Sequence, residues 1–259
     1  MIFRGHHFST TLAKETPLTL VLPDGSSPEG RRRTVYLLHG LCGRSGDWLD
    51  YTPLPLLAER HDVAFVMPDA ARSFYADMAC GFPYFTYVTE ELPDFCARTF
   101  RLPTAREDTG VIGVSMGGYG ALKCALARPE RYAFCAAFAS PCLFLRDFLE
   151  HPHTPEEEAA FKAQNGPQLW TDLRAAFGDP FVWTPSDGIL ELAGRAATAP
   201  QRPRIYAACG EGDFTREEHL RFAQAMRGLD LDFTFEEWPG KHDWSFFGEA
   251  LDRALARSR

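Results

Sequence analysis

The chain has 259 residues, of which 45% are hydrophobic and 24% charged, and its formal net charge is −8. This length and apolar content suit one α/β domain with a full core. The acidic balance and the scattered Lys and Arg residues argue against nucleic acid as the main partner. One dense basic run, 31–33, directly precedes a predicted strand and is typical of a solvated strand entry. No run of eighteen apolar residues occurs, so the sequence predicts no membrane-spanning helix.

The seven cysteines are odd in number and include no Cys-x-x-Cys pair. Most lie inside apolar runs, where cysteine behaves as a small buried hydrophobe. The first residues lack the charged and then apolar pattern of a secretory signal. We therefore expect reduced thiols and a cytoplasmic location. No ligand spacing typical of structural zinc occurs, so we expect neither a metal nor another cofactor.

Short β-branched and aromatic runs alternate along the chain with longer segments of helical periodicity, a pattern typical of an α/β fold. The predicted strands are 18–22, 34–38, 63–67, 109–114, 133–139, 204–209 and 231–236. Several are apolar without alternation, as expected for parallel strands that helices cover on both faces. The turn-rich stretch 23–28 joins the first two strands closely enough for them to pair antiparallel.

The best-marked helices are 84–100, 116–128 and 215–227. The first contains Pro93, which must kink it or begin a second piece. The third starts with Thr215 and Glu218 at capping-box spacing, which predicts that the two residues cap its first turn.

The segment 141–200 breaks the alternation of strands and helices. It has helical patterns and many prolines but no convincing strand, and it is too long for a simple crossover. In sheet enzymes such an excursion usually lies over the carboxyl edge of the strands, where ligands bind. We therefore predict one domain, 1–259, with a helical cap inserted at about 141–200. A peripheral helical insertion is the alternative.

Gly113, Ser115 and Gly117 form a G-x-S-x-G motif between the predicted strand 109–114 and the predicted helix 116–128. A sharp strand-to-helix turn holds such a serine in a strained conformation, and the small neighbours let the chain segments approach closely. The following helix directs its free N–H groups and its positive end at a developing oxyanion. This context predicts that Ser115 is a nucleophile rather than part of a structural turn.

A serine hydroxyl needs a base to take its proton, and in folds with this motif the acid and then the histidine follow the serine. His242 lies in a turn after the last predicted strand and is the predicted base, whereas His219 falls in the middle of a helix. Asp213 follows the strand 204–209 and is the predicted acid, with Glu211 as the alternative. Asp213 could also simply stabilise the start of the next helix.

The loop 39–43 follows an earlier predicted strand, the position that normally supplies the second oxyanion donor. We predict that the backbone N–H groups of Leu41 and Met116 are the two donors. His39 precedes a tight glycine turn and is expected to order this loop. The other histidines outside the predicted helices are expected to have surface or packing roles: His6, His7, His61, His151 and His153.

The motifs with a family likeness are Leu38-His39-Gly40-Leu41, the run from Gly113 to Leu122, Cys209-Gly210-Glu211-Gly212-Asp213-Phe214 and His242-Asp243-Trp244. In combination they resemble the esterase D family, whose members include S-formylglutathione hydrolases, tributyrin and acetyl esterases and feruloyl esterases. The resemblance spans roughly 30–250. It implies an α/β-hydrolase fold, with a mostly parallel central sheet and helices on both faces. It also implies the roles given above for Ser115, Asp213, His242, Leu41 and Met116.

Two departures narrow the resemblance. Positions 114 and 119 tend to carry His in S-formylglutathione hydrolases proper, whereas this chain has Val114 and Tyr119. The chain therefore looks more like the tributyrin and acetyl esterase branch.

The predicted function is a serine carboxylesterase that hydrolyses acetyl to butyryl esters through an acyl-enzyme on Ser115. The alternatives are an S-formylglutathione hydrolase or a feruloyl or aryl esterase, and more distantly an acyltransferase or an inactive binding protein. The expected partner is a small-molecule ester, and the chain is compatible with a monomer or a homo-oligomer.

Overall fold

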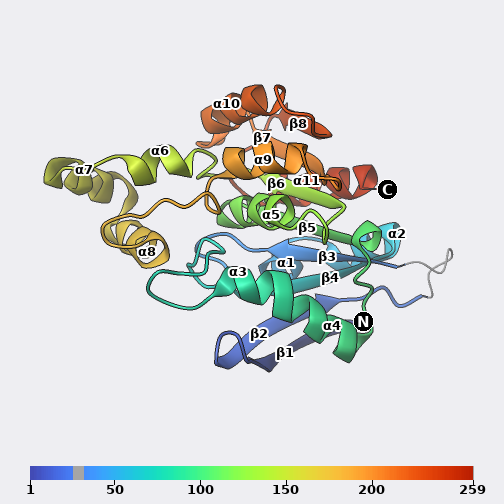
Figure 1. The fold of residues 1–259 in the computed structure, drawn as a ribbon. Coiled ribbons are helices and arrows are strands. Elements are labelled where there is room, and N and C mark those ends of the chain that lie inside the picture. Colours follow the sequence, from blue (N-terminus) through green and yellow to red (C-terminus); the bar gives the residue numbers. More distant parts are fainter. Residues whose placement is uncertain (26–31, 259) are drawn as a thin grey trace.

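The computed structural model describes residues 1–25 and 32–258. An eight-stranded sheet runs through the molecule with helices on both faces, which confirms the predicted α/β-hydrolase fold (Figure 1). The strands are β1 (Ile2–Ser9), β2 (Lys14–Val21), β3 (Arg33–Leu38), β4 (Val63–Pro68), β5 (Thr109–Val114), β6 (Phe134–Phe138), β7 (Arg204–Gly210) and β8 (Phe233–Trp238).

The strand order is β1-β2-β4-β3-β5-β6-β7-β8. All neighbours from β4 to β8 in this order are parallel, and β2 is antiparallel to both β1 and β4. The predicted antiparallel pairing of 18–22 with 34–38 is therefore wrong, because β4 lies between the two strands. The predicted turn at 23–28 and the basic run at 31–33 fall partly outside the described residues.

The helices are α1 (Asp47–Tyr51), α2 (Leu54–His61), α3 (Tyr84–Thr86), α4 (Leu92–Phe100), α5 (Met116–Ala127), α6 (Leu145–Glu150), α7 (Pro155–Asn165), α8 (Pro167–Phe177), α9 (Ile189–Ala197), α10 (Arg216–Met226) and α11 (Trp244–Arg257). Apolar side chains of α3, α4, α5, α9 and α10 bury one face of the sheet. Those of α1, α2 and α11 bury the other face. In the part of the chain that the structure describes, no helix is long and apolar enough to cross a membrane.

The predicted helix 84–100 is continuous along the backbone but is not a regular α-helix throughout. A π-helical segment, Tyr87–Glu91, links α3 to α4, which begins at Leu92, and the residues at both junctions have helical backbone angles. Pro93 directly follows the π-helical segment, and its missing N–H removes one hydrogen bond of the helix. The irregular segment therefore lies next to Pro93, but no separate second helix begins there.

The described segment 141–200 forms α6, α7, α8 and α9 and contains no strand. The first three helices project together beyond one end of the sheet, while α9 lies beside α5 (Figure 1). Aromatic rings hold the projecting helices together: Phe148 of α6 contacts Phe161 of α7 and Trp170 of α8, with ring centroids 5.4 and 6.0 Å apart.

A buried ion pair joins the sheet domain to this helical segment. Asp187 lies in the connection between α8 and α9, and its Oδ1 is 2.9 Å from Lys123 Nζ of α5. Both side chains are almost fully buried. The hydroxyl of Tyr119 donates a second hydrogen bond, 2.8 Å long, to the Asp187 carbonyl. The start of α9 is thereby fastened to the helix that follows β5.

We expect Lys123→Met to lower the free energy of unfolding by about 3–5 kcal/mol, because it leaves the Asp187 carboxylate buried without its cation. Urea denaturation measures the loss. The matched control is Lys162→Met, since Lys162 pairs with Glu158 on the surface of α7. This control should cost less than about 1 kcal/mol. Equal losses in the two variants would contradict a special contribution of the buried pair.

Candidate active site

Ser115 lies on a tight turn between β5 and α5. Its backbone has φ 54° and ψ −125°, a region that residues other than glycine rarely adopt. A Cβ atom on Gly113 would lie 2.0 Å from the Gly117 carbonyl oxygen, and one on Gly117 would lie 2.4 Å from the Leu38 oxygen. Gly113 is therefore needed for the turn to close on itself, and Gly117 is needed for it to pack against the end of β3.

Asp213 and His242 come together from two turns at the same edge of the sheet. Asp213 follows β7 and His242 follows β8, and His242 Nδ1 lies 2.9 Å from Asp213 Oδ2. The Asp213 side chain is fully buried, whereas that of His242 is 25% exposed. An ionised carboxylate can only accept, so Nδ1–H is the donor and neutral His242 keeps a free lone pair on Nε2.

The other carboxylate oxygen of Asp213 is also occupied. Its Oδ1 accepts hydrogen bonds from the Thr215 N–H at 2.9 Å and from the Thr215 hydroxyl at 2.8 Å. Burial by itself would raise the pKa of Asp213, but the hydrogen bonds from His242 and Thr215 outweigh it and hold the pKa below its ordinary value. Asp213 is therefore an ionised acceptor. Glu211, the alternative acid, is exposed and does not contact His242 among the described residues.

Ser115 and His242 are connected through Phe214, and no hydrogen bond joins the two side chains in the described chain. Ser115 lines the cavity together with Phe214, and the Phe214 ring lies against the His242 ring with centroids 4.7 Å apart. Bonds between a nucleophile and its base are often long in ligand-free enzymes and tighten when substrate binds. The arrangement is therefore compatible with proton transfer from the serine.

The loop that was predicted to supply an oxyanion donor passes directly beside the serine. A Cβ atom on Gly40 would lie 3.4 Å from the Ser115 Cβ, and both Leu41 and Met116 line the Ser115 cavity. Met116 is the first residue of α5, so its N–H has no partner within the helix. The two predicted donor residues thus line the same cavity as Ser115.

His39 orders this loop, as the sequence indicated. Its Nε2 accepts a hydrogen bond from the Ala70 N–H at 3.0 Å, and its Nδ1 donates to the Gly40 carbonyl at 2.7 Å. Burial lowers the pKa of His39, which favours the neutral ring that these two bonds require. Both ring nitrogens are occupied, so His39 is not available as a base.

The Ser115 cavity has a volume of about 440 Å³ and mostly apolar walls. The loops at the edge of the sheet that carries Ser115 supply part of its lining, together with Glu218 of α10, and the segment that contains α6, α7 and α8 supplies the rest. The side chains from the helical segment are Pro141, Cys142, Phe144, Leu145, Phe148, Phe161, Asn165, Leu169 and Leu173. The insertion therefore forms one wall of the cavity that contains the serine.

The sequence matches the model of the Esterase family, described as "Putative esterase", over residues 9–258. The chain belongs to this family. An acetyl esterase of Caldicellulosiruptor saccharolyticus is 28% identical over 265 residues, which cover 98% of this chain and 96% of that protein. An S-formylglutathione hydrolase of Paracoccus denitrificans is 30% identical over 161 residues, which cover 52% of this chain and 56% of that protein.

A solved structure extends this likeness to the fold. FphF, a fluorophosphonate-binding serine hydrolase of Staphylococcus aureus, aligns with a TM-score of 0.82 and 25% identity, covering 100% of this chain and 98% of that chain. The predicted resemblance to the esterase D family is confirmed, and this esterase is a hydrolase of carboxylic esters.

Glu218 is a cavity residue of the esterase that the sequence did not reveal. The predicted capping box is wrong: Thr215 precedes α10 but bonds to Asp213, and no side-chain bond caps the helix. Glu218 instead accepts the backbone N–H groups of Leu143 and Phe144 at 2.6 and 3.2 Å. Burial raises its pKa although these bonds oppose the shift. The spacing that suggested a cap gave no sign of this long-range contact.

His219 is buried on α10 one residue further on. Its Nε2 accepts a hydrogen bond from the Ser140 N–H at 2.7 Å, so protonation there would set two N–H groups against each other. Burial lowers the pKa of His219 from 6.5 to about 4. The folded esterase therefore needs this histidine neutral, and its role is structural.

The esterase should lose stability in mild acid partly through His219. The unfolded chain binds a proton below pH 6.5 while the folded chain resists it until about pH 4, so the free energy of unfolding falls across that window. The share of His219 is about 2 kcal/mol between pH 7 and pH 5. His219→Gln keeps an acceptor for Ser140 and should flatten this dependence in urea denaturation at the two pH values. The control His6→Gln removes an exposed histidine near the start of the chain and should leave this pH dependence as it is in the parent. An unchanged pH dependence in His219→Gln would contradict the role assigned to His219.

Proposed function

We propose that this esterase hydrolyses acetyl to butyryl esters of a small alcohol through an acyl-enzyme on Ser115. The observation that carries the proposal is the Asp213–His242 hydrogen bond beside an apolar cavity that contains a strained serine. The full-length likeness to an acetyl esterase supports the choice of a short acyl group.

In the proposed first step, Ser115 Oγ bonds to the acyl carbon of the ester while His242 Nε2 takes the hydroxyl proton. Asp213 holds the Nδ1–H side of the ring and stabilises the imidazolium that forms. His242 then gives the proton to the leaving alcohol oxygen as the ester C–O bond breaks, which leaves an acyl-enzyme. In the second step, water attacks with His242 again as base, and the acid and Ser115 are released.

The negative charge that develops on the acyl oxygen needs donors at a fixed place. We assign them as the backbone N–H groups of Leu41 and Met116, two residues that line the Ser115 cavity. Loss of one such donor typically costs about 3–4 kcal/mol in the barrier. The positive end of α5 acts in the same direction because its axis begins at Met116.

The apolar walls suit the acyl side of the ester, since Phe144, Phe148 and Leu173 offer a hydrocarbon group no competing hydrogen bonds. The same aromatic rings could accept a phenolic acyl group, so an aryl esterase is the second candidate.

We further infer a cytoplasmic location, with all seven cysteines free in the structure and none in a disulfide.

The acyl preference is tested with p-nitrophenyl acetate, butyrate and octanoate, beside methyl ferulate and S-formylglutathione. We expect kcat/KM to be highest for acetate or butyrate and to fall at octanoate. A clear preference for the ferulate or the thioester would replace the proposed substrate class and leave the serine mechanism in place. Absence of turnover with every substrate would overturn the hydrolytic function.

The proposed acid is tested by Asp213→Asn against Glu211→Gln. The first should lower kcat by about 10⁴-fold, because an amide no longer holds His242 in the productive tautomer. The second should leave kcat within about twofold of the parent, since Glu211 is exposed. Ser115→Ala provides the reference for complete loss. The reverse result for the two acids would assign the role to Glu211.

A further inference from the structure

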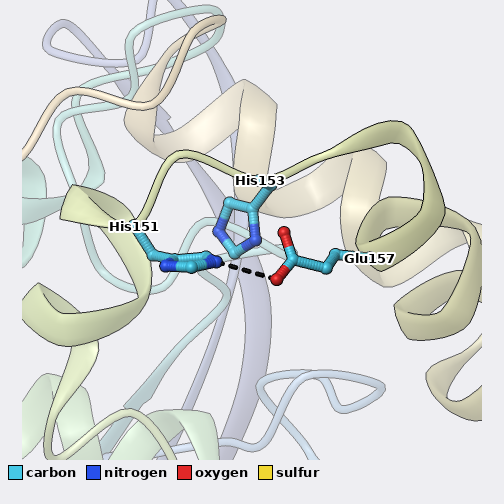
Figure 2. A group of neighbouring side chains, drawn as sticks. All are labelled: His151, His153 and Glu157. Atoms are coloured by element: carbon cyan, nitrogen blue, oxygen red, sulfur yellow. Dashed lines mark hydrogen bonds and ion pairs between the residues drawn. The ribbon is translucent and has the colours of Figure 1, made fainter.

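Three metal-binding side chains gather where α6 joins α7. His151 ends α6, His153 lies in the connection and Glu157 belongs to the first turn of α7. One ligand atom from each lies within 4.8 Å of the other two. Figure 2 shows the two imidazole rings and the carboxylate facing one another. Imidazole nitrogen and carboxylate oxygen together form a donor set that zinc and its neighbours in the first transition row favour.

His153 is the rigid member of this group. Its Nε2 lies 2.9 Å from the carbonyl oxygen of Phe148, which can only accept, so Nε2 carries the proton and Nδ1 keeps the lone pair. Three aromatic rings hold the imidazole in place: those of Phe148, Trp170 and Phe181, at centroid distances of 4.5, 5.2 and 5.7 Å. A backbone carbonyl that binds the second ring nitrogen is the support that metal-ligating histidines usually have.

Glu157 is oriented in a similar way. Its Oε2 accepts the Thr154 N–H at 2.8 Å, while Oε1 lies 3.0 Å from His151 Nε2. One carboxylate oxygen is thus held by the backbone and the other is directed at the histidine. A cation can replace the hydrogen bond between His151 and Glu157 without disturbing the bond that anchors the carboxylate.

Room and charge both permit a cation here. The side chains of His151 and Glu157 are 50% and 47% exposed, so water reaches the group and the two side chains can adjust. The nearby cations Lys162 and Arg174 are each already paired with an acid, Glu158 and Asp179. Neither of them therefore neutralises Glu157.

We propose that His153 Nδ1, His151 Nε2 and Glu157 Oε1 bind one divalent transition-metal cation, with Zn²⁺ as the representative, and that water completes its coordination. Zinc bonds of about 2.0–2.1 Å in a tetrahedron require donor atoms about 3.4 Å apart. The ligand atoms now lie within 4.8 Å of one another, and His151 Nε2 and Glu157 Oε1 are 3.0 Å apart, so each separation must change by at most about 1.4 Å. Rotation of the exposed His151 and Glu157 side chains supplies this shift.

The site would clamp the cap and does not take part in the proposed hydrolysis. It joins the end of α6 to the start of α7, and the Phe148 and Phe161 side chains of these helices line the Ser115 cavity. A bound cation would therefore hold the cavity wall in one arrangement. Its binding can be measured whether or not Ser115 is the nucleophile.

The test is isothermal titration of the full chain with ZnCl₂ after chelator treatment and removal of the chelator. We expect one equivalent to bind, and His151→Ala and Glu157→Gln each to weaken binding by about tenfold or more. Glu157→Gln should still fold, because glutamine also serves in the capping box with Thr154. The matched control is His6→Ala, which removes an exposed histidine on β1 and should bind Zn²⁺ as the parent does.

Titration with Co²⁺ identifies the donor atoms. We expect d–d absorption of a nitrogen and oxygen site with no thiolate charge-transfer band, which excludes the exposed Cys42 and Cys80 as the ligands. Absence of stoichiometric Zn²⁺ binding would overturn the proposal. So would equal affinity in the parent, His151→Ala and Glu157→Gln, or a thiolate band with Co²⁺.

Discussion

The buried carboxylate of Asp213 makes bonds to two separate parts of the fold. One oxygen accepts from His242 in the turn after β8, and the other accepts both the N–H and the hydroxyl of Thr215 at the start of α10. The start of α10 is therefore set by the same group that orients His242. Further along that helix, Glu218 and His219 bind backbone N–H groups around 140–144, where the helical insertion begins. The geometry of the proposed triad and the position of the cavity wall thus depend on one ionised side chain.

The fold holds Asp213 and His219 of α10 in different charge states. Asp213 stays ionised because several donors outweigh its burial, whereas burial lowers the pKa of His219 and keeps it neutral, which suits a Nε2 that accepts the Ser140 N–H. Each group is stable in the charge state that its backbone partners demand. A change in charge on either one would be transmitted to the insertion, because Asp213 binds Thr215 before α10 and the helix itself binds the backbone of 140–144, where the insertion begins.

The features that the sequence predicted well were those with a local physical signal. Buried parallel strands read as apolar runs, and the G-x-S-x-G motif stands between a strand and a helix, so β5 and the turn at Ser115 were foreseen. The antiparallel strand β1 was missed because most of its residues are exposed and its pattern is weak. The second partner of β2, the strand β4, and the backbone groups that Glu218 binds lie far away in the sequence, and no spacing within their own segments could reveal them.

The wall of the cavity depends on such distant contacts more than the residues of the proposed triad do. The insertion is joined to the rest of the molecule by Glu218, by the Lys123–Asp187 pair and by the Arg72–Asp172 pair, in which Arg72 Nε lies 2.7 Å from Asp172 Oδ2. None of these contacts touches Ser115, Asp213 or His242 except through α10. The volume offered to the acyl group can therefore change with the helical insertion while the hydrogen bonds of the proposed triad stay the same. Substrate range and catalytic geometry are separable in this fold, and so a motif at Ser115 can indicate the reaction without indicating the acyl group.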